Sequence, residues 1–187
     1  MTGAATHIRE LHQSFYDFWL ENRTPDGRVE DKKIELSVLR SIAPNIVKIA
    51  KTPEGPKYTI IGTKVVEEYK QNFTGLLVSE HPHEVCRKTY LSMINQMEQQ
   101  SSLINCHGYF CYPSKNYLRT METAFALTKD AEISGYLVLV TVDHTNYDGN
   151  MYLPREPSDV IAHEVQIETQ QDFDGMMKSY RQLSKDG

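Results

Sequence analysis

The sequence lacks the features of several large protein classes. Its longest nearly apolar run, Ile133 to Val142, is about ten residues long, whereas a membrane-spanning helix needs about 20. Three cysteines in 187 residues suit a reducing compartment better than a disulfide framework. A net charge of −5 argues against nucleic-acid binding through an overall basic field. The first ten residues contain no apolar signal region, so we expect a cytoplasmic protein.

Motifs of common catalytic and metal sites are missing as well. The scattered glycines form neither a P-loop nor a dinucleotide-binding fingerprint, and GxSxG, HExxH and CxxC do not occur. Cys106 and Cys111 lie an odd number of positions apart on a predicted strand, so their side chains should point to opposite faces. His81 and His83 precede a helix, where we favour solvent-exposed side chains over metal ligands. We therefore predict neither a metal site nor catalytic residues.

Residues 7–22 predict an amphipathic helix. Its large apolar side chains recur at spacings of three and four, which is the period of one helix face. This stripe needs a partner surface, and two alternatives stay open: docking on the protein's own core, or contact with a second copy in a homodimer. The candidate interface residues are Ile8, Leu11, Phe15, Phe18 and Trp19.

The middle of the chain begins with a short helix and two strands. A helix over 34–43 should end at Pro44, because a proline disfavours helical geometry in the residue before it. Strands over 45–51 and 57–61 are separated by a segment rich in turn-forming residues, which predicts an antiparallel hairpin. The next helix should begin at Thr63, a good capping residue.

The pattern then changes from a long helix to strands. Residues 82–100 predict the longest helix, and from residue 101 apolar residues alternate with a period of two. Three strands are expected, over 101–112, 117–128 and 133–143. The sequence therefore predicts an α+β fold with a five-stranded antiparallel sheet and helices on one face.

Charge and composition suggest three parts. Residues 1–33 would form the N-terminal amphipathic helix and a loop, and residues 34–144 the central domain. Residues 145–187 carry a net charge of −4 and should form an acidic extension. Within this extension, apolar residues from Asp172 to Leu183 follow a helical period, and residues 158–170 fit either a helix or a strand.

The order of these elements is that of PAS domains. The segment from Ile34 to Gly75 also resembles a family of stand-alone bacterial PAS-like proteins known mainly from alphaproteobacteria. The resemblance rests on Pro44 at a helix end, Gly62-Thr63 after a strand pair, and Phe73-Thr74-Gly75 further on. It covers about residues 8–143. It implies a sensory or regulatory domain whose pocket lies between the sheet and the helices.

Two cofactors found in PAS domains are disfavoured by the sequence. A haem protein similar to the known type needs a histidine on the long helix, and none occurs from Val85 to Gln100. The flavin photosensors of that superfamily carry a six-residue cysteine motif on a helix, which Asn105-Cys106-His107 matches too briefly. We therefore assign no cofactor.

The long helix and the last three strands supply candidates for a pocket. Such pockets are mostly apolar and contain a few orienting polar groups. A filled core made of the same residues is the alternative, and a shift of one position along a strand would exchange each candidate for its neighbour. The ligand-binding candidates are Tyr90, Met93, Met97, His107, Tyr109, Met121, Thr123, Phe125, Tyr136 and Val138.

Three functions remain open at this stage. The first is a sensory module that binds a small molecule or a partner protein and signals through flanking helices or dimerisation. The second is an interaction protein without a small ligand. The third is a small α+β enzyme that uses His107, Tyr109 and Glu122 for acid–base chemistry. Glu122 counts against the enzyme, because it alternates with Met121 and Phe125 and should face away from their side.

Overall fold

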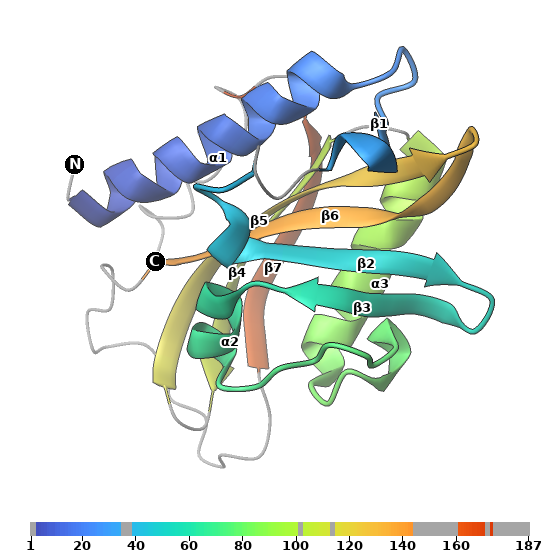
Figure 1. The fold of residues 1–187 in the computed structure, drawn as a ribbon. Helices are drawn as coiled ribbons and strands as arrows, with labels where there is room; N and C mark the ends of the chain where they lie inside the picture. Colours follow the sequence, from blue (N-terminus) through green and yellow to red (C-terminus); the bar gives the residue numbers. More distant parts are fainter. Residues whose placement is uncertain are drawn as a thin grey trace.

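A seven-stranded sheet organises the computed structural model (Figure 1). The structure describes residues 3–34, 39–100, 103–112, 115–143, 161–170 and Phe173. Of residues 3–5, 108–112, 115–119 and 161–170 it describes only the backbone. The strands follow the order β3-β2-β6-β5-β4-β7, and β1 pairs with β5 outside this path.

The predicted hairpin and three-stranded meander form the centre of the sheet. β2 (Ile46–Thr52) and β3 (Gly55–Ile61) make the hairpin, and β2 pairs with the last strand of the meander, β6. The meander consists of β4 (Leu103–Tyr112), β5 (Lys115–Lys129) and β6 (Glu132–Asp143). These five strands pair antiparallel, as expected. The α+β class is confirmed, and the arrangement is compatible with a PAS-like fold.

Two further strands make the sheet larger than predicted. β7 (Ile161–Gln170) pairs antiparallel with β4, so part of the acidic extension belongs to the sheet. β1 (Val29–Glu30) pairs parallel with β5 beyond the last residue of β5 that pairs with β4. The sheet is therefore mixed rather than wholly antiparallel. A two-residue strand leaves no periodic pattern in a sequence, which explains why β1 was missed.

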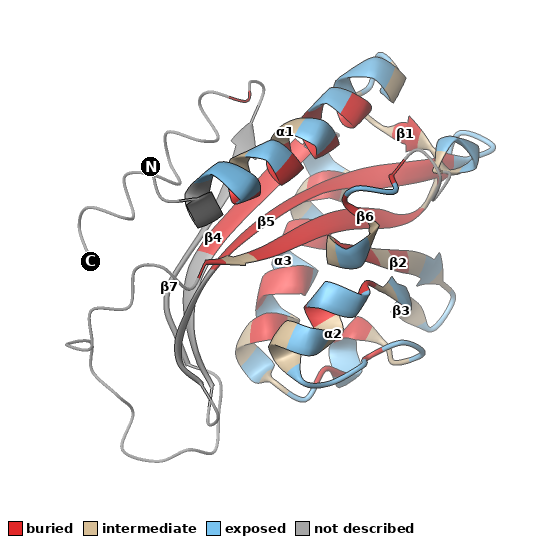
Figure 2. Cartoon of the chain, turned by 60° about the vertical axis from the view of Figure 1, so that its left-hand side comes forward, coloured by how far each residue is buried: buried red, intermediate tan, exposed pale blue. Residues whose placement is uncertain are grey.

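The helices cover both faces of the sheet: the helices of the central domain lie on one face, as predicted, and the N-terminal helix covers the other. α1 (Gly3–Asn22) packs against one face, and the part of the helix coloured as buried in Figure 2 lies on the side of the strands. α2 (Thr63–Tyr69) and α3 (Glu84–Gln100) pack against the other face. Apolar residues from both sides of every central strand are consequently buried. α1, with 20 residues, is longer than α3, with 17.

The short connections differ from prediction at two points. Pro44 lies inside a 3-10 helix, η2 (Ala43–Asn45), and the described part of the expected helix before it, residues 39–42, is a turn. α2 has Gly62 rather than Thr63 at its N-cap, without a side-chain cap. The backbone explains this choice, because a Cβ on Gly62 would lie 2.2 Å from the Pro44 carbonyl oxygen. Two more 3-10 helices, η1 (Asp31–Lys33) and η3 (Val78–Glu80), complete the connections.

The β5–β6 hairpin forms as predicted over a two-residue turn. Asp130 and Ala131 both have positive φ values, 53° and 67°, as a type I′ turn requires. Such turns match the twist of the adjoining strands. The turn sets the pairing of Lys129 with Glu132, and an irregularity between Leu127 and Thr128 then shifts the register by one residue along the rest of the strand pair.

Beyond β7 the structure describes only Phe173, which is buried and lies 5.7 Å from the Tyr16 ring of α1. The rest of the helix predicted over 172–183 lies outside the described residues. Within the described part of the chain, each helix is too short or too polar to cross a membrane.

Candidate functional site

The structure does not bring the ten pocket candidates together. The five from α3 and β6 face the layer between the sheet and α3: Tyr90, Met93, Met97, Tyr136 and Val138. The opposite face, under α1, holds Met121, Phe125, Thr123 and His107. The side chain of Tyr109 lies outside the described residues.

Strand register is the reason for this division. β5 and β6 pair Ala124 with Val138 and Phe125 with Leu137, and directly paired residues share a face. Even-numbered residues of β5 therefore lie beside Tyr136 and Val138. The prediction combined odd-numbered positions on β4 and β5 with even-numbered positions on β6, which was wrong for β4 and β5.

The five candidate interface residues of α1 are buried against the chain's own sheet. Each is at most 7% exposed, and Phe15 stacks on Phe125 of β5 with ring centroids 4.9 Å apart. The structure thus provides intramolecular partners for the whole stripe. A dimer contact through the same residues would require α1 to leave this position.

A polar network beneath α1 fixes this helix to the sheet. His12 is fully buried, with Nδ1 2.8 Å from the Thr123 hydroxyl and Nε2 2.9 Å from the Thr141 hydroxyl. Thr123 donates to Asn105 Oδ1 at 2.7 Å, so its oxygen accepts from His12 Nδ1–H. Burial, together with the nearby His107, lowers the pKa of His12 to about 3. The neutral imidazole therefore joins α1 to β5 and β6.

The opposite face holds a buried acid in the middle of β5. Glu122 is 2% exposed and lies between Cys106 of β4 and Val140 of β6. Burial raises its pKa to about 7, and a hydrogen bond with Tyr69 opposes part of that rise. Oε2 of this carboxyl has no hydrogen-bond partner among the described residues. Glu122 is thus a titratable group at neutral pH in an apolar layer.

Tyrosines and cysteines surround this acid. Burial, followed by the charge of Glu122 among other groups, raises the pKa values of Tyr58, Tyr90 and Cys106. The Tyr58 hydroxyl is also buried without a partner among the described residues. We name this group the Glu122 cluster, and its members are Glu122, Tyr58, Tyr69, Tyr90, Cys86 and Cys106.

A cleft of about 290 Å³ adjoins the Glu122 cluster. It lies where the β2–β6 pairing stops, at Ile46 and Leu139, and where α1 and α2 approach each other from opposite faces. Tyr69 lines the cleft and also bonds Glu122. We name it the α1–α2 cleft, and its lining residues are His7, Ile8, Leu11, Ser41, Pro44, Asn45, Lys64, Val65, Glu68, Tyr69, Val140, Thr141 and Val142.

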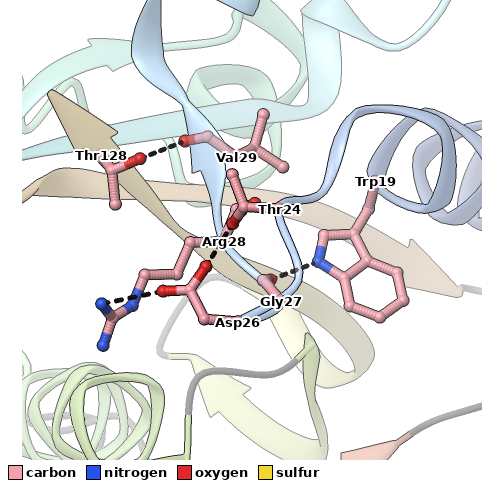
Figure 3. Close-up of polar contacts among 7 residues, drawn as sticks. All are labelled: Trp19, Thr24, Asp26, Gly27, Arg28, Val29 and Thr128. Carbon is pink, nitrogen blue, oxygen red and sulfur yellow. Dashed lines mark hydrogen bonds and ion pairs between the residues drawn. The ribbon is translucent and has the colours of Figure 1, made fainter. Parts of the chain in front are cut away.

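A second hollow, of about 630 Å³, lies between the 24–32 loop and the β5–β6 turn. Three of its four acidic residues have ion-pair partners: Asp26 pairs with Arg28, Glu30 with Lys32, and Asp31 with Lys48. Figure 3 shows how the loop is held. Trp19 donates from Nε1 to the Gly27 carbonyl at 2.8 Å, and Asp26 bonds both Thr24 and Arg28. These contacts hold the loop in place beside the hollow.

His81 is not solvent-exposed, contrary to prediction. It is 2% exposed, and its ring centroid lies 4.3 Å from that of Phe73. Burial lowers its pKa to about 4, so the ring is neutral and serves the packing. Within the described part of the chain, no group of three or more His, Cys, Asp and Glu side chains could hold a metal ion.

Sequence reasoning missed several members of this site. It set Glu122 aside because it assumed that Met121 and Phe125 faced the pocket. Tyr58 and Tyr69 were not considered, because a single tyrosine, whether in the middle of β3 or at the end of α2, carries no distinctive spacing. A glutamate inside an otherwise apolar strand was the one available signal, since acids are almost never fully buried without a partner.

Comparisons with known proteins add little. No family model and no curated protein matches the sequence. Among solved structures, the chain is similar to one from the Vibrio cholera VqmA–ligand–DNA complex, at 11% sequence identity and a TM-score of 0.45. The alignment covers 58% of this chain and 51% of that one, so it spans about half of the neighbour's length. A likeness this weak carries no argument about function.

Proposed function

We propose that this protein is a sensory or regulatory module of the PAS-like type that binds a small molecule in the α1–α2 cleft. The observation that carries this proposal is Glu122, a buried acid with an unpaired oxygen directly behind the cleft wall. Leaving a buried polar atom unpaired costs about 1–3 kcal/mol, and more if it is charged. Ionisable groups with perturbed pKa values concentrate at functional sites.

The cleft itself suits a small molecule. Its volume of about 290 Å³ is close to the lower end of the range of small-molecule sites, roughly 300–1,000 Å³. Ile8, Leu11, Val65 and Val140 give it apolar walls. A few polar groups at such a site orient the bound molecule.

α1 is the natural transmitter of a binding signal. Its first turns form one wall of the cleft through His7, Ile8 and Leu11, and the same helix is fixed to the sheet by His12. A ligand that contacts the helix stabilises one of its positions relative to another. Signalling through a protein partner or a second copy of the chain stays a prediction, which light scattering with and without ligand tests.

The acid–base alternative loses its geometric basis. His107 pairs across the strands with Met121 and faces α1, whereas Glu122 faces the α2–α3 layer. The sheet lies between the two side chains. A reaction that needs both groups at one substrate is therefore not proposed.

Native mass spectrometry of the freshly purified protein tests the proposal, followed by denaturation and identification of any released molecule. Ser41→Trp fills the cleft from an exposed position. Ser92→Trp, an exposed position on α3 away from the cleft, is the matched control. We expect a small molecule at near-stoichiometric occupancy in the wild type and Ser92→Trp, and its loss in Ser41→Trp. An unliganded mass in all three would favour an interaction protein without a small ligand.

A further inference from the structure

We infer that the ligand of the α1–α2 cleft is a small amine whose protonated nitrogen binds the Glu122 carboxylate. This inference rests on the proposed function and specifies the chemistry of its ligand. It follows from the hydrogen bonds around Glu122, from the charges near it, and from the composition of the cleft walls.

The hydrogen bonds leave one position open. The Glu122 carboxyl interacts with the Tyr69 hydroxyl, and Oε2 has no partner among the described residues. An ionised carboxylate only accepts hydrogen bonds. Above its pKa of about 7 the carboxyl is mainly ionised, and the missing partner of that form is a donor, such as an N–H or O–H group.

The charges favour a cationic donor over a neutral one. The groups that interact electrostatically with Glu122 are Tyr58, Tyr90 and Cys106, which are uncharged at neutral pH. Within the described part of the chain, no lysine or arginine pairs with Glu122. A buried carboxylate without a cation is unfavourable, because its charge is neither solvated nor neutralised. A ligand ammonium group supplies the missing charge, and a ligand anion would be repelled.

A second glutamate of this protein shows the paired arrangement. Glu98 on α3 also accepts a hydrogen bond from a tyrosine, Tyr136, at 2.6 Å. Its carboxylate lies 2.6 Å from the Lys51 ammonium nitrogen, and its pKa is lowered, chiefly by the hydrogen bond from Lys51. Glu122 has the tyrosine but lacks the ammonium group. At Glu122, the ligand's ammonium group would therefore take the position that the Lys51 ammonium group takes at Glu98.

The route to Glu122 passes Tyr69, the last residue of α2. Tyr69 lines the cleft and bonds the acid, and Lys70 after it has a positive φ of 58° that ends the helix. The proposal therefore requires the Tyr69 side chain to rotate away so that the ligand reaches the buried carboxylate. The neighbouring walls include the apolar Val65 and Val140, and the charged lining residues Lys64 and Glu68 pair with each other at 3.6 Å. The ligand is accordingly an amine with a compact apolar body.

Three probes of equal size and different charge test the inference: benzylamine, benzyl alcohol and benzoate, each titrated by NMR at pH 8. We expect benzylamine to bind at least about tenfold more tightly than benzyl alcohol, because hydrogen bonds to charged groups are that much stronger than neutral ones. Benzoate should bind most weakly. Ser41→Trp should abolish binding of benzylamine.

Glu122→Gln is the decisive variant, and Glu98→Gln is its matched control. Glu122→Gln should reduce benzylamine affinity to that of benzyl alcohol and leave benzyl alcohol affinity within about twofold. The unchanged affinity for benzyl alcohol also shows that the variant is folded. Glu98→Gln should retain the full preference, because Glu98 lies outside the cleft.

The outcomes separate this inference from the proposed function. Three results would contradict an amine ligand but remain compatible with the binding of a small molecule. They are equal affinity for the three probes, a preference that survives Glu122→Gln, and an anionic molecule released in native mass spectrometry. The same holds if no probe binds and the native ligand that is released carries no amino group. If neither a probe nor a native ligand binds, both proposals fail.

Discussion

The raised pKa of Glu122 makes the stability of this protein depend on pH in a predictable direction. In the unfolded chain this carboxyl ionises near pH 4.5, and in the folded protein near pH 7. Between these values the folded state retains a proton that the unfolded state has lost. The contribution of Glu122 to the free energy of unfolding therefore falls as the pH rises through this range.

The size of the effect follows from the two pKa values. From 4.5 to about 7, the difference corresponds to roughly 3 kcal/mol once the pH exceeds both values. Glutamine has nearly the same shape, can still accept a hydrogen bond from Tyr69 and has no charge to desolvate. Glu122→Gln should therefore be close to the wild type in stability at pH 5. At pH 8 it should be more stable by about 2–3 kcal/mol.

Urea unfolding at the two pH values measures this difference. Trp19 is the only tryptophan and is 2% exposed, so its fluorescence reports the unfolding of the α1 layer. With a urea dependence of about 2 kcal/mol per molar, the midpoint of Glu122→Gln should exceed that of the wild type by about 1 M at pH 8.

Two buried histidines make the free energy of unfolding depend on pH in the opposite direction, so their contribution must be removed from the comparison. Burial lowers the pKa values of His12 and His81 to about 3 and about 4. The stability they contribute is present above pH 6.5 and is lost as the pH falls toward those values. Both proteins carry these histidines, so comparing the two at each pH removes their effect. If the variant differs from the wild type equally at pH 5 and pH 8, the reasoning about Glu122 is refuted.

Three more predictions concern the fold. Gly62→Ala places a Cβ 2.2 Å from the Pro44 carbonyl oxygen. It should lower the free energy of unfolding, measured in urea, by about 1–3 kcal/mol. An unchanged unfolding midpoint would contradict this close contact. Ala131→Gly relieves the strain of a φ of 67° and should raise the melting temperature. After the entropic cost of glycine, the expected gain in the free energy of unfolding is up to about 1 kcal/mol. A lower melting temperature would contradict the idea that the turn is strained. Phe15→Ala removes a fully buried ring stacked on Phe125 and should lower the free energy of unfolding by about 3–5 kcal/mol. A loss below about 1 kcal/mol would show that α1 does not pack on the sheet as described.

The elements with a long periodic pattern were predicted well from sequence. Residues 7–22 form most of α1, and residues 133–143 correspond closely to β6, because in both cases burial of one stripe or strand sets the spacing of apolar residues. The β5–β6 turn was predicted because it joins two strong strand patterns with four polar or small residues. The elements that were missed are short or ambiguous. β1 has two residues, and the pattern of β7 fitted a helix equally well.

The sequence predicted only part of the candidate site, and the reason differs from that for the missed strands. Tyr90 and Met93 were assigned to the correct layer, because a helix has one buried face. Phe125 and Thr123 were assigned to the wrong one, because both faces of β5 are buried. In a strand that is buried on both faces, no face consists of polar residues, so the sequence does not show which face each residue occupies. Either choice of face satisfies the same pattern.

The sequence alone determined the long helices α1 and α3 and the five central strands, and that α1 must bury its apolar stripe. These are local consequences of side-chain spacing and backbone preference. Tertiary structure decided that α1 covers the face opposite α3, and that Glu122 rather than His107 lies beside Tyr69. Those outcomes depend on the register between strands far apart in the chain. A shift of one residue would have reversed every side chain of β5 while leaving the local patterns unchanged.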